Sequence, residues 1–200
     1  MLYIGVDLGT SAVKLLLMNE EGKIEKIVSR EYPLSFPHPG WSEQKPEDWW
    51  TQSIEGIKEL TAECDKSQVA GISFGGQMHG LVILDENDEV IRPAILWNDG
   101  RTQKETEYLN NVIGKEKLSE LTGNIAFAGF TAPKLLWLKA NEPENFAKIK
   151  KLTKSFGVLH FIFLIFLFIL SFLSFSYVFY FSHLTLPFLH KSLQSVCSKM

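Results

Sequence analysis

The chain opens with two apolar segments, residues 2–6 and 12–18, on either side of a short polar turn. Their lengths and their content of Leu, Val and Ile predict two strands joined by this turn. A third strand is predicted at 23–31, after a second turn at 19–22. Three consecutive antiparallel strands therefore begin the fold, and the first of them ends in an acidic residue.

After the opening strands, the spacing of apolar residues changes to that of a helix. Residues 46–63 are predicted as a helix, because Pro46 suits its first turn and apolar residues then recur at helical spacing. The loop before this helix, residues 33–44, is rich in proline and glycine. The recurring apolar positions are Trp50, Ile54, Ile57 and Leu60.

Further along, short apolar runs alternate with helical segments. Residues 69–74 are predicted as a buried strand, since the run is short and apolar throughout. Strands that alternate with helices after an antiparallel opening indicate an α/β layered domain. Further strands are predicted at 81–84 and 94–97, and helices at 103–112, 115–122 and 133–140.

The first turn carries the sequence Asp7-Leu8-Gly9-Thr10-Ser11. Such a turn can bring backbone N–H groups and hydroxyls up to a phosphate, while the acid holds a hydrated magnesium ion. Glycine suits the centre of the turn because a side chain there would keep the phosphate away from the backbone. The same residue types are common in ordinary turns, so a purely structural turn is the alternative.

Charge divides the chain into two unlike parts. Residues 1–150 contain 16 basic and all 23 acidic residues, a net charge of −7, whereas residues 151–200 carry +4. The first part has the composition of an ordinary acidic domain and shows no basic face that would suggest nucleic acid as a partner. Cys64 and Cys197 are single and far apart, so neither a disulfide framework nor a zinc site is indicated.

Five motifs in the first part stand in an order and spacing seen together in one family. With these motifs, residues 1–150 resemble the xylulokinase group of the FGGY carbohydrate kinases. Several motifs in register are far more specific than one, and the Gln-Met-His-Gly loop distinguishes this group from the glycerol kinases. The motifs are Asp7-Leu8-Gly9-Thr10-Ser11, Trp41-Ser42-Glu43-Gln44, Gly76-Gln77-Met78-His79-Gly80, Leu96-Trp97-Asn98-Asp99-Gly100-Arg101 and Gly129-Phe130-Thr131-Ala132-Pro133-Lys134-Leu135-Leu136-Trp137.

The resemblance implies a fold and a reaction. The fold is the α/β, ribonuclease-H-like fold of the actin-like ATPase superfamily, with two such domains around a cleft, of which residues 1–150 would be an incomplete first domain. The reaction transfers the γ-phosphate of ATP, with Mg²⁺, to a sugar hydroxyl, and converts D-xylulose to D-xylulose 5-phosphate. Such transfer depends on positioning and charge neutralisation more than on covalent chemistry.

Site residues carry over from the resemblance position by position. Asp7 would lie near the magnesium ion and the reacting phosphate, and Thr10 and Ser11 would lie on the phosphate side. Met78 and His79 would contact the ketose. The residues expected close to the same pocket are Asn98, Asp99 and Arg101.

Taken singly, several of these residues have structural alternatives. His79 alone would be read as a solvated or capping histidine, and Arg101 alone as a surface cation. Glu43 and Asp99 are also suitable loop caps. Trp50, Trp97 and Trp137 are predicted to be core residues, whereas Trp41 lies in an exposed-looking loop.

The catalytic base is expected outside this chain. In the family the base is an aspartate well beyond residue 200, which accepts the proton of the attacking hydroxyl. The adenosine-binding parts belong mostly to the second domain. We therefore expect the chain as written not to phosphorylate D-xylulose by itself.

Residues 151–200 form a hydrophobic tail of another kind. The segment 156–190 contains no Asp, Glu, Lys or Arg, and 158–181 is long enough and apolar enough to span a bilayer as a helix. Three lysines within 150–154 precede it and favour a cytoplasmic N-terminal side. We interpret the tail as the product of a frame shift or read-through, with a genuine membrane anchor as the alternative.

Two other functions stay open at this point. One is a non-catalytic, membrane-anchored sugar-binding module that retains the Gln77-Met78-His79 loop. The other is a kinase for a related ketose or polyol, because substrate choice depends on hydroxyl contacts from both domains. A cytoplasmic location is expected, or a membrane location if segment 158–181 is genuine.

Overall fold

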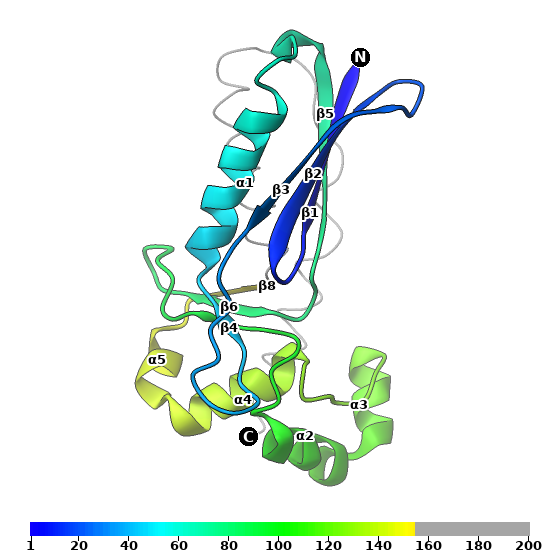
Figure 1. Cartoon of the computed structure of the whole chain (residues 1–200). Helices are drawn as coiled ribbons and strands as arrows, with labels where there is room; N and C mark the ends of the chain where they lie inside the picture. Colours follow the sequence, from blue (N-terminus) through cyan, green and yellow to red (C-terminus); the bar gives the residue numbers. More distant parts are fainter. Residues whose placement is uncertain (155–200) are drawn as a thin grey trace.

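The structure of the 200-residue chain, a computed structural model, describes residues 1–154 (Figure 1). The predicted membrane segment at 158–181 and the rest of the tail from residue 155 lie outside the described residues. None of the described helices is long and apolar enough to cross a membrane. The strands are β1 (Leu2–Leu8), β2 (Ala12–Asn19), β3 (Ile24–Glu31), β4 (Glu43–Gln44), β5 (Val69–Gly76), β6 (Leu81–Leu84), β7 (Ala94–Ile95) and β8 (Lys151–Lys154). The helices are α1 (Pro46–Leu60), α2 (Gln103–Tyr108), α3 (Lys115–Thr122), α4 (Thr131–Asn141) and α5 (Pro143–Lys148), with a 3-10 turn at Lys66–Gln68 and a π-helical turn at Leu109–Gly114.

The first sheet has the strand order β3-β2-β1-β5, in which β5 runs parallel to β1 and the other neighbours are antiparallel. This order confirms the three predicted opening strands. β1 is longer than predicted because its ladder with β2 continues as far as the pair Leu8–Val13. Asp7 consequently lies within the strand, opposite Lys14, and not in the turn.

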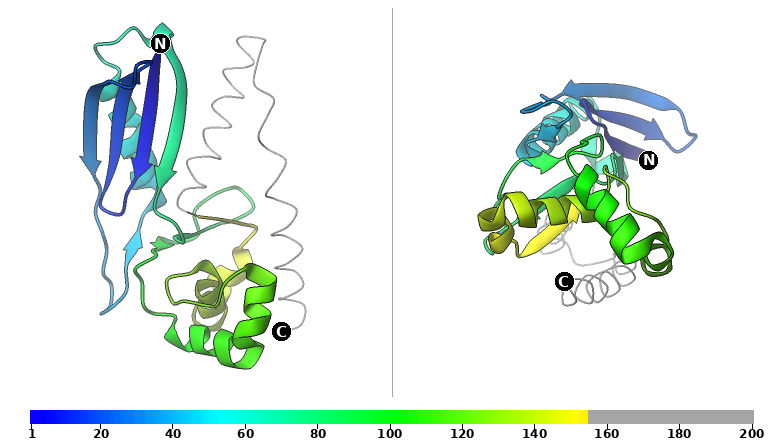
Figure 2. Two further views of the ribbon diagram at one scale, coloured as in Figure 1. Left: turned by 90° about the vertical axis from the view of Figure 1, so that its right-hand side faces the viewer. Right: turned by 90° about the horizontal axis from the view of Figure 1, so that it is seen from below.

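Every second residue of the two central strands is buried. In β1 these residues are Ile4, Val6 and Leu8, and β2 repeats the alternation. Helix α1 covers this face of the sheet, as two views of the ribbon show (Figures 1 and 2). Tyr3 and Asp7, between the buried positions, are exposed. The alternation is that of a sheet packed on one face by a helix.

Of the apolar positions that recur at helical spacing, helix α1 fully buries only Leu60. A Cβ atom on Gly56 would lie 2.5 Å from Leu15 Cδ1, so the helix approaches the sheet most closely along its small residues. The large side chains Trp50 and Ile57 pack beside this line of contact and are only partly buried. The helix also ends at Leu60, three residues before the predicted end. The residues that it buries are Pro46, Trp49, Ser53, Gly56 and Leu60.

Strand β5 is not the buried strand that its apolar sequence predicts. Its residues alternate between partly buried and exposed, and within residues 1–154 it pairs with β1 alone. It is therefore an edge strand of the described sheet. It also continues two residues beyond the predicted end, through Gly75 and Gly76, because its parallel ladder follows β1 to Leu8.

A second, smaller sheet lies beside the end of the first and has the order β4-β7-β6-β8. Helix α4 packs Trp137 and Leu138 against Leu81 and Ile83 of β6. Sequence analysis did not predict α5 or β8. β8 pairs antiparallel with β6 and follows α5 in the chain.

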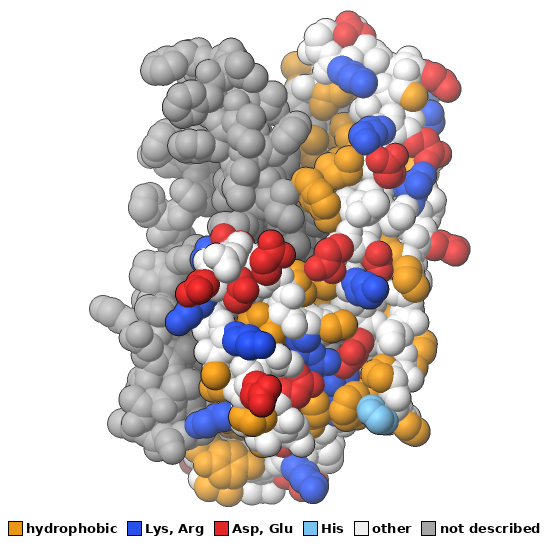
Figure 3. Space-filling model, turned by 90° about the vertical axis from the view of Figure 1, so that its left-hand side faces the viewer, with side chains coloured by type: hydrophobic (Ala, Val, Ile, Leu, Met, Phe, Trp, Pro, Cys, Tyr) orange, Lys and Arg blue, Asp and Glu red, His pale blue; other side chains and the backbone are white. Residues whose placement is uncertain are grey.

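Helices α2, α3, α4 and α5 lie at the end of the molecule that carries this second sheet (Figures 1 and 2). The predicted helix at 103–112 is α2 followed by the π-helical turn, and α3 has its predicted bounds. Gly114, with a φ of +95°, allows the chain to turn between them. On the face in Figure 3, acidic and basic side chains are interspersed over the described residues.

Candidate functional site

The parallel pairing of β1 and β5 creates the site. Both strands end at the same edge of the sheet, with Leu8 opposite Gly76, so the residues that follow each strand become neighbours. A Cβ atom on Gly76 would lie 2.9 Å from both Cβ and O of Leu8, which makes glycine necessary for this close approach. The backbone N–H of Gln77 then donates to Leu8 O at 2.8 Å.

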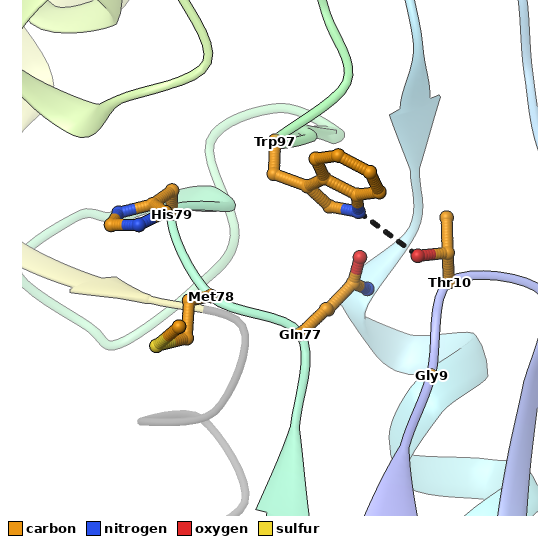
Figure 4. A pocket seen from close by; sticks show the side chains of 6 residues that line it. All are labelled: Gly9, Thr10, Gln77, Met78, His79 and Trp97. Carbon is orange, nitrogen blue, oxygen red and sulfur yellow. Dashed lines mark hydrogen bonds between the residues drawn. The ribbon is translucent and has the colours of Figure 1, made fainter. Parts of the chain in front are cut away.

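A cavity of about 340 Å³, which we call the edge pocket, opens at this edge of the sheet (Figure 4). The Gln77 side chain points from the end of β5 toward Thr10 and Trp97, whereas Met78 and His79 point away from Thr10. Two of the predicted ketose-contacting residues and one of the predicted phosphate-side residues therefore meet here. The lining residues are Gly9, Thr10, Gln77, Met78, His79 and Trp97.

The turn that follows β1 is fixed from three sides. The Tyr32 hydroxyl donates to Gly9 O, and Gln44 Nε2 donates to Thr10 O at 2.7 Å. Trp97 Nε1 donates to Thr10 Oγ1 at 3.0 Å, which leaves the Thr10 hydroxyl proton available to a ligand. Burial, and after it the Asp7 carboxylate, raises the pKa of Tyr32, so this phenol stays a hydrogen-bond donor.

One amide side chain connects the two walls of the edge pocket. Gln44 donates to the turn through Nε2, and its Oε1 accepts from Trp49 Nε1 at 3.0 Å and from Gln77 Nε2 at 3.4 Å. Gln44 and Trp49 are both buried. The indole therefore sets the orientation of the amide, and the amide sets the distance between the turn and Gln77.

The loop Gln77–His79 is held in an unusual conformation. His79 has a φ of +65°, in the left-handed region that is uncommon for residues other than glycine, although histidine adopts it more often than most of them. Its imidazole stacks on the Phe130 ring with 4.3 Å between centroids and 18° between planes. Its carbonyl oxygen accepts from Lys134 Nζ at 2.7 Å, and Lys134 also donates to Gly129 O at 2.7 Å.

Lys134 is completely buried, and desolvation lowers its pKa from 10.5 to about 7. The Asp99 carboxylate opposes this shift, and the Arg101 guanidinium adds to it. Sequence analysis missed this lysine as a site residue. A signal was present, because it shares a helix face with Trp137 and Leu138 at i+3 and i+4.

Asp99 and Arg101 do not line the edge pocket. They belong to a buried ion-pair cluster, defined as Glu43, Arg92, Asp99, Arg101 and Glu142. Asp99 Oδ2 accepts from Arg101 Nη2 at 2.7 Å and from the Ser42 amide at 2.6 Å. Arg101 Nη2 also lies 2.7 Å from Glu43 Oε1, and its guanidinium lies 3.7 Å from the centroid of the Trp41 ring.

The structure contradicts several single-residue interpretations. Arg101 is not a surface cation, because its side chain is fully buried between carboxylates and indole rings. Trp97 is not a core residue: it is 50% exposed and forms a wall of the edge pocket. Trp137 is buried as predicted, and Trp41 is half-buried because Trp137 and Arg101 pack against it.

Three other predicted site residues lie around the edge pocket without lining it. Asp7, Ser11 and Asn98 are all exposed. Asp7 precedes the turn by two residues, and Asn98 follows Trp97 directly. Among the described residues, no three His, Cys, Asp or Glu side chains converge in a way that could hold a metal ion.

Comparisons with known proteins identify the family of this chain. The model of the FGGY family of carbohydrate kinases, N-terminal domain, matches residues 2–175. The xylulose kinase of Bacillus subtilis (strain 168) is 48% identical over 147 residues, which are 72% of this chain and 29% of that protein. The xylulose kinase of Klebsiella pneumoniae is 44% identical over 150 residues, 75% of this chain and 31% of that protein.

A solved structure shows the same fold. The crystal structure of a xyloylose kinase from Brucella ovis superposes with a TM-score of 0.75 at 43% identity, and the match covers 80% of this chain and 34% of that chain. The present chain therefore spans about a third of the length of the relatives it matches. The matches confirm the predicted actin-like ATPase fold for the described domain. This chain belongs to the FGGY family of carbohydrate kinases, through the family's N-terminal domain.

Proposed function

We propose that this chain provides the sugar-binding side of an ATP-dependent kinase that converts D-xylulose to D-xylulose 5-phosphate. Relatives named xylulose kinase, up to 48% identical, support the substrate. The observation that carries the proposal is the edge pocket, in which the turn after β1 meets the Gln77–His79 loop. Because ATP is the phosphoryl donor, we propose that the protein acts in the cytoplasm.

The edge pocket offers groups that suit a small polyhydroxylated ligand. The Gln77 side-chain amide is a neutral hydrogen-bonding group for sugar hydroxyls. Trp97, held by its bond to Thr10, presents a fixed aromatic surface to the C–H groups of the sugar. Met78 is 65% exposed, so its side chain is free of the core and available to a ligand.

The turn after β1 would form the side of the site that binds the transferred phosphate. Thr10 and Ser11, with the backbone N–H groups of the turn, would face the transferred phosphate. Asp7 is the carboxylate proposed to hold Mg²⁺, whose remaining ligands would be water and phosphate oxygens, as is usual for this ion. The ion would neutralise charge on the phosphate, while the chain's own residues position the sugar hydroxyl.

Asn98, Asp99 and Arg101 take different parts in this proposal. Asn98 is exposed beside Trp97 and can reach a ligand at the rim of the edge pocket. Asp99 and Arg101 act without lining the edge pocket. Their ion pair, within the buried ion-pair cluster, fixes the backbone just after Trp97. Their contribution is the position of Trp97 and not contact with the sugar.

Ligand binding to the full 200-residue chain tests the proposal. Isothermal titration with D-xylulose is compared with titrations with D-ribulose and xylitol, a related ketose and a polyol. We expect D-xylulose to bind most tightly. His79→Ala should weaken this binding, because it removes the imidazole from the edge pocket and from Phe130.

His38→Ala is the matched control, since His38 is exposed and does not line the edge pocket. It should leave the affinity for D-xylulose unchanged. Equal affinity for all three ligands would contradict the proposed specificity. Absence of binding to any of them would contradict sugar binding by this chain.

A further inference from the structure

We infer that Lys134 is a positioning residue, which holds the Gln77–His79 loop in the conformation that forms the edge pocket. The inference rests on the proposed function only for the identity of the ligand. Lys134 lies in α4, and its two acceptors lie in other segments of the chain. One ammonium group therefore joins α4 and the turn just before it to the Gln77–His79 loop, which lies 55 residues earlier in the chain.

The first acceptor is at the strained point of the loop. Lys134 Nζ donates to the carbonyl oxygen of His79, whose φ of +65° is costly for a residue with a side chain. Such a conformation persists only when the surroundings enforce it. From the side of α4, the bond to Lys134 and the stack on Phe130 hold this conformation.

The second acceptor connects the loop to Trp97. Lys134 donates to Gly129 O, and Gly129 packs so closely on Trp97 that a Cβ atom there would lie 2.2 Å from Trp97 O. Phe130, which stacks on His79, follows Gly129 in the chain. Lys134 thus sets the position of His79 relative to Trp97 without touching the cavity itself, of which it is not a lining residue.

Burial makes this lysine a costly choice for a purely structural role. A fully buried ammonium loses its hydration, and the charged groups that act on it are Asp99, which favours the charged form, and Arg101, which disfavours it. An apolar side chain would fill the same volume at lower cost. What it would not supply is the pair of hydrogen bonds to His79 O and Gly129 O.

The test compares Lys134→Met, Lys134→Arg and Lys139→Met in the full chain. Lys139 is the matched control, because it lies in the same helix with an exposed side chain. The first readout is the NMR signal of the His79 ring protons, which the stacked Phe130 ring shifts upfield. It is assigned by comparison with His79→Ala and needs no ligand. The second readout is the affinity for D-xylulose.

We expect Lys134→Met to remove the upfield shift and to weaken D-xylulose binding about tenfold, equivalent to about 1.4 kcal/mol. Lys134→Arg retains cationic donors and should keep part of both. Lys139→Met should change neither. If Lys134→Met does not fold, Lys134→Gln, which has a single amide donor group, is expected to give an intermediate loss of the upfield shift.

An unchanged His79 signal and unchanged affinity in folded Lys134→Met would overturn the inference, whatever the change in melting temperature. So would an unchanged signal in Lys134→Gln. If the unmodified chain does not bind D-xylulose, the proposed function fails, while the His79 signal still decides the role of Lys134.

Discussion

The edge pocket and the buried ion-pair cluster lie only two residues apart in sequence and use polar side chains in opposite ways. Trp97 is half exposed in the edge pocket, whereas Asp99 is buried with its two carboxylate oxygens bonded to Arg101 and to the Ser42 amide. In the edge pocket, hydrogen bonds to the backbone and between side chains fix the walls, and Trp97 and Met78 still expose much of their surface. In the buried ion-pair cluster, hydrogen bonds and ion pairs between charged side chains occupy the groups that could otherwise bind a ligand.

The difference shows that a single sequence motif can contain both ligand-facing residues and residues that only hold the backbone in place. The segment Trp97-Asn98-Asp99-Gly100-Arg101 is one motif by resemblance, yet only Trp97 lines the cavity. Asp99 anchors the segment to the Ser42 backbone N–H, 57 residues earlier in the chain, and Arg101 anchors it to Glu43. Motif residues therefore divide into those that meet a ligand and those that hold them in place.

Of the substitutions that test this difference, Arg101→Met should lower the free energy of unfolding most. The substitution leaves the buried carboxylates of Asp99 and Glu43 without their shared cation. Breaking a buried ion pair from one side costs about 3–5 kcal/mol. We expect a loss of this size in the free energy of unfolding, measured by urea denaturation followed by circular dichroism.

Asn98→Ala is its control, because Asn98 belongs to the same motif but is exposed. Its effect on the free energy of unfolding should stay within about 0.5 kcal/mol. A loss below about 1 kcal/mol for Arg101→Met would show that the cluster is not a buried ion-pair network in solution.

Lys134 lies between the two regions and should make stability depend on pH. Because its pKa is lowered from 10.5 to about 7, the folded chain binds fewer protons than the unfolded chain between these values. The free energy of unfolding should therefore rise with pH from 7 toward 10, by at most about 1.4 kcal/mol per pH unit.

The slope belongs to Lys134 only if Lys134→Met lacks it, so the measured quantity is the difference between the two chains at each pH. Above pH 10 the raised pKa of Tyr32 acts in the opposite direction, because the unfolded chain then releases the phenol proton first. A difference that stays constant between pH 7 and 10 would contradict the shift.

Trp97→Phe should have the smallest effect on stability. Phenylalanine keeps an aromatic wall but cannot donate to Thr10 Oγ1. Water can replace this donor at a half-exposed site, so we expect a loss of less than about 1 kcal/mol in the free energy of unfolding. D-xylulose affinity, measured by titration, should fall several-fold because the indole no longer fixes the wall.

Trp50→Phe, on α1 and outside the edge pocket, provides the comparison and should leave the affinity unchanged. A larger loss of affinity for Trp50→Phe than for Trp97→Phe would mean that Trp97 is not a wall of the sugar site.

Local pattern predicted most of the first sheet. Alternation and turn residues are set within a few positions, so β1, β2 and β3 appear at nearly the predicted bounds. The apolar spacing of α1 includes Leu60, which is buried, but not Ser53 and Gly56, which the helix also buries. Contact with Leu15 selects Gly56, and a small residue gives no signal in an apolar pattern.

The site divides in the same way. The family motifs predict that Met78 and His79 contact the ketose and that Thr10 lies on the phosphate side, and in the structure all three line one cavity. The exposure of Trp97 and the burial of Arg101 depend on partners from Thr10, Glu43 and Trp41, which sequence spacing does not place. For the same reason, no local pattern predicted β8, whose partner β6 lies some seventy residues earlier.

The parallel pairing of β1 with β5 has a consequence for the order in which the chain folds. The hairpins of β1, β2 and β3 close over short loops, whereas β5 joins β1 only after more than sixty intervening residues are arranged. Contacts of long sequence separation form slowly, because the entropy of closing the loop is lost before the contact is gained. The bond from Lys134 to His79, 55 residues apart, comes under the same rule. Sugar binding should therefore be among the last properties that this chain acquires as it folds, and among the first that it loses under mild denaturation.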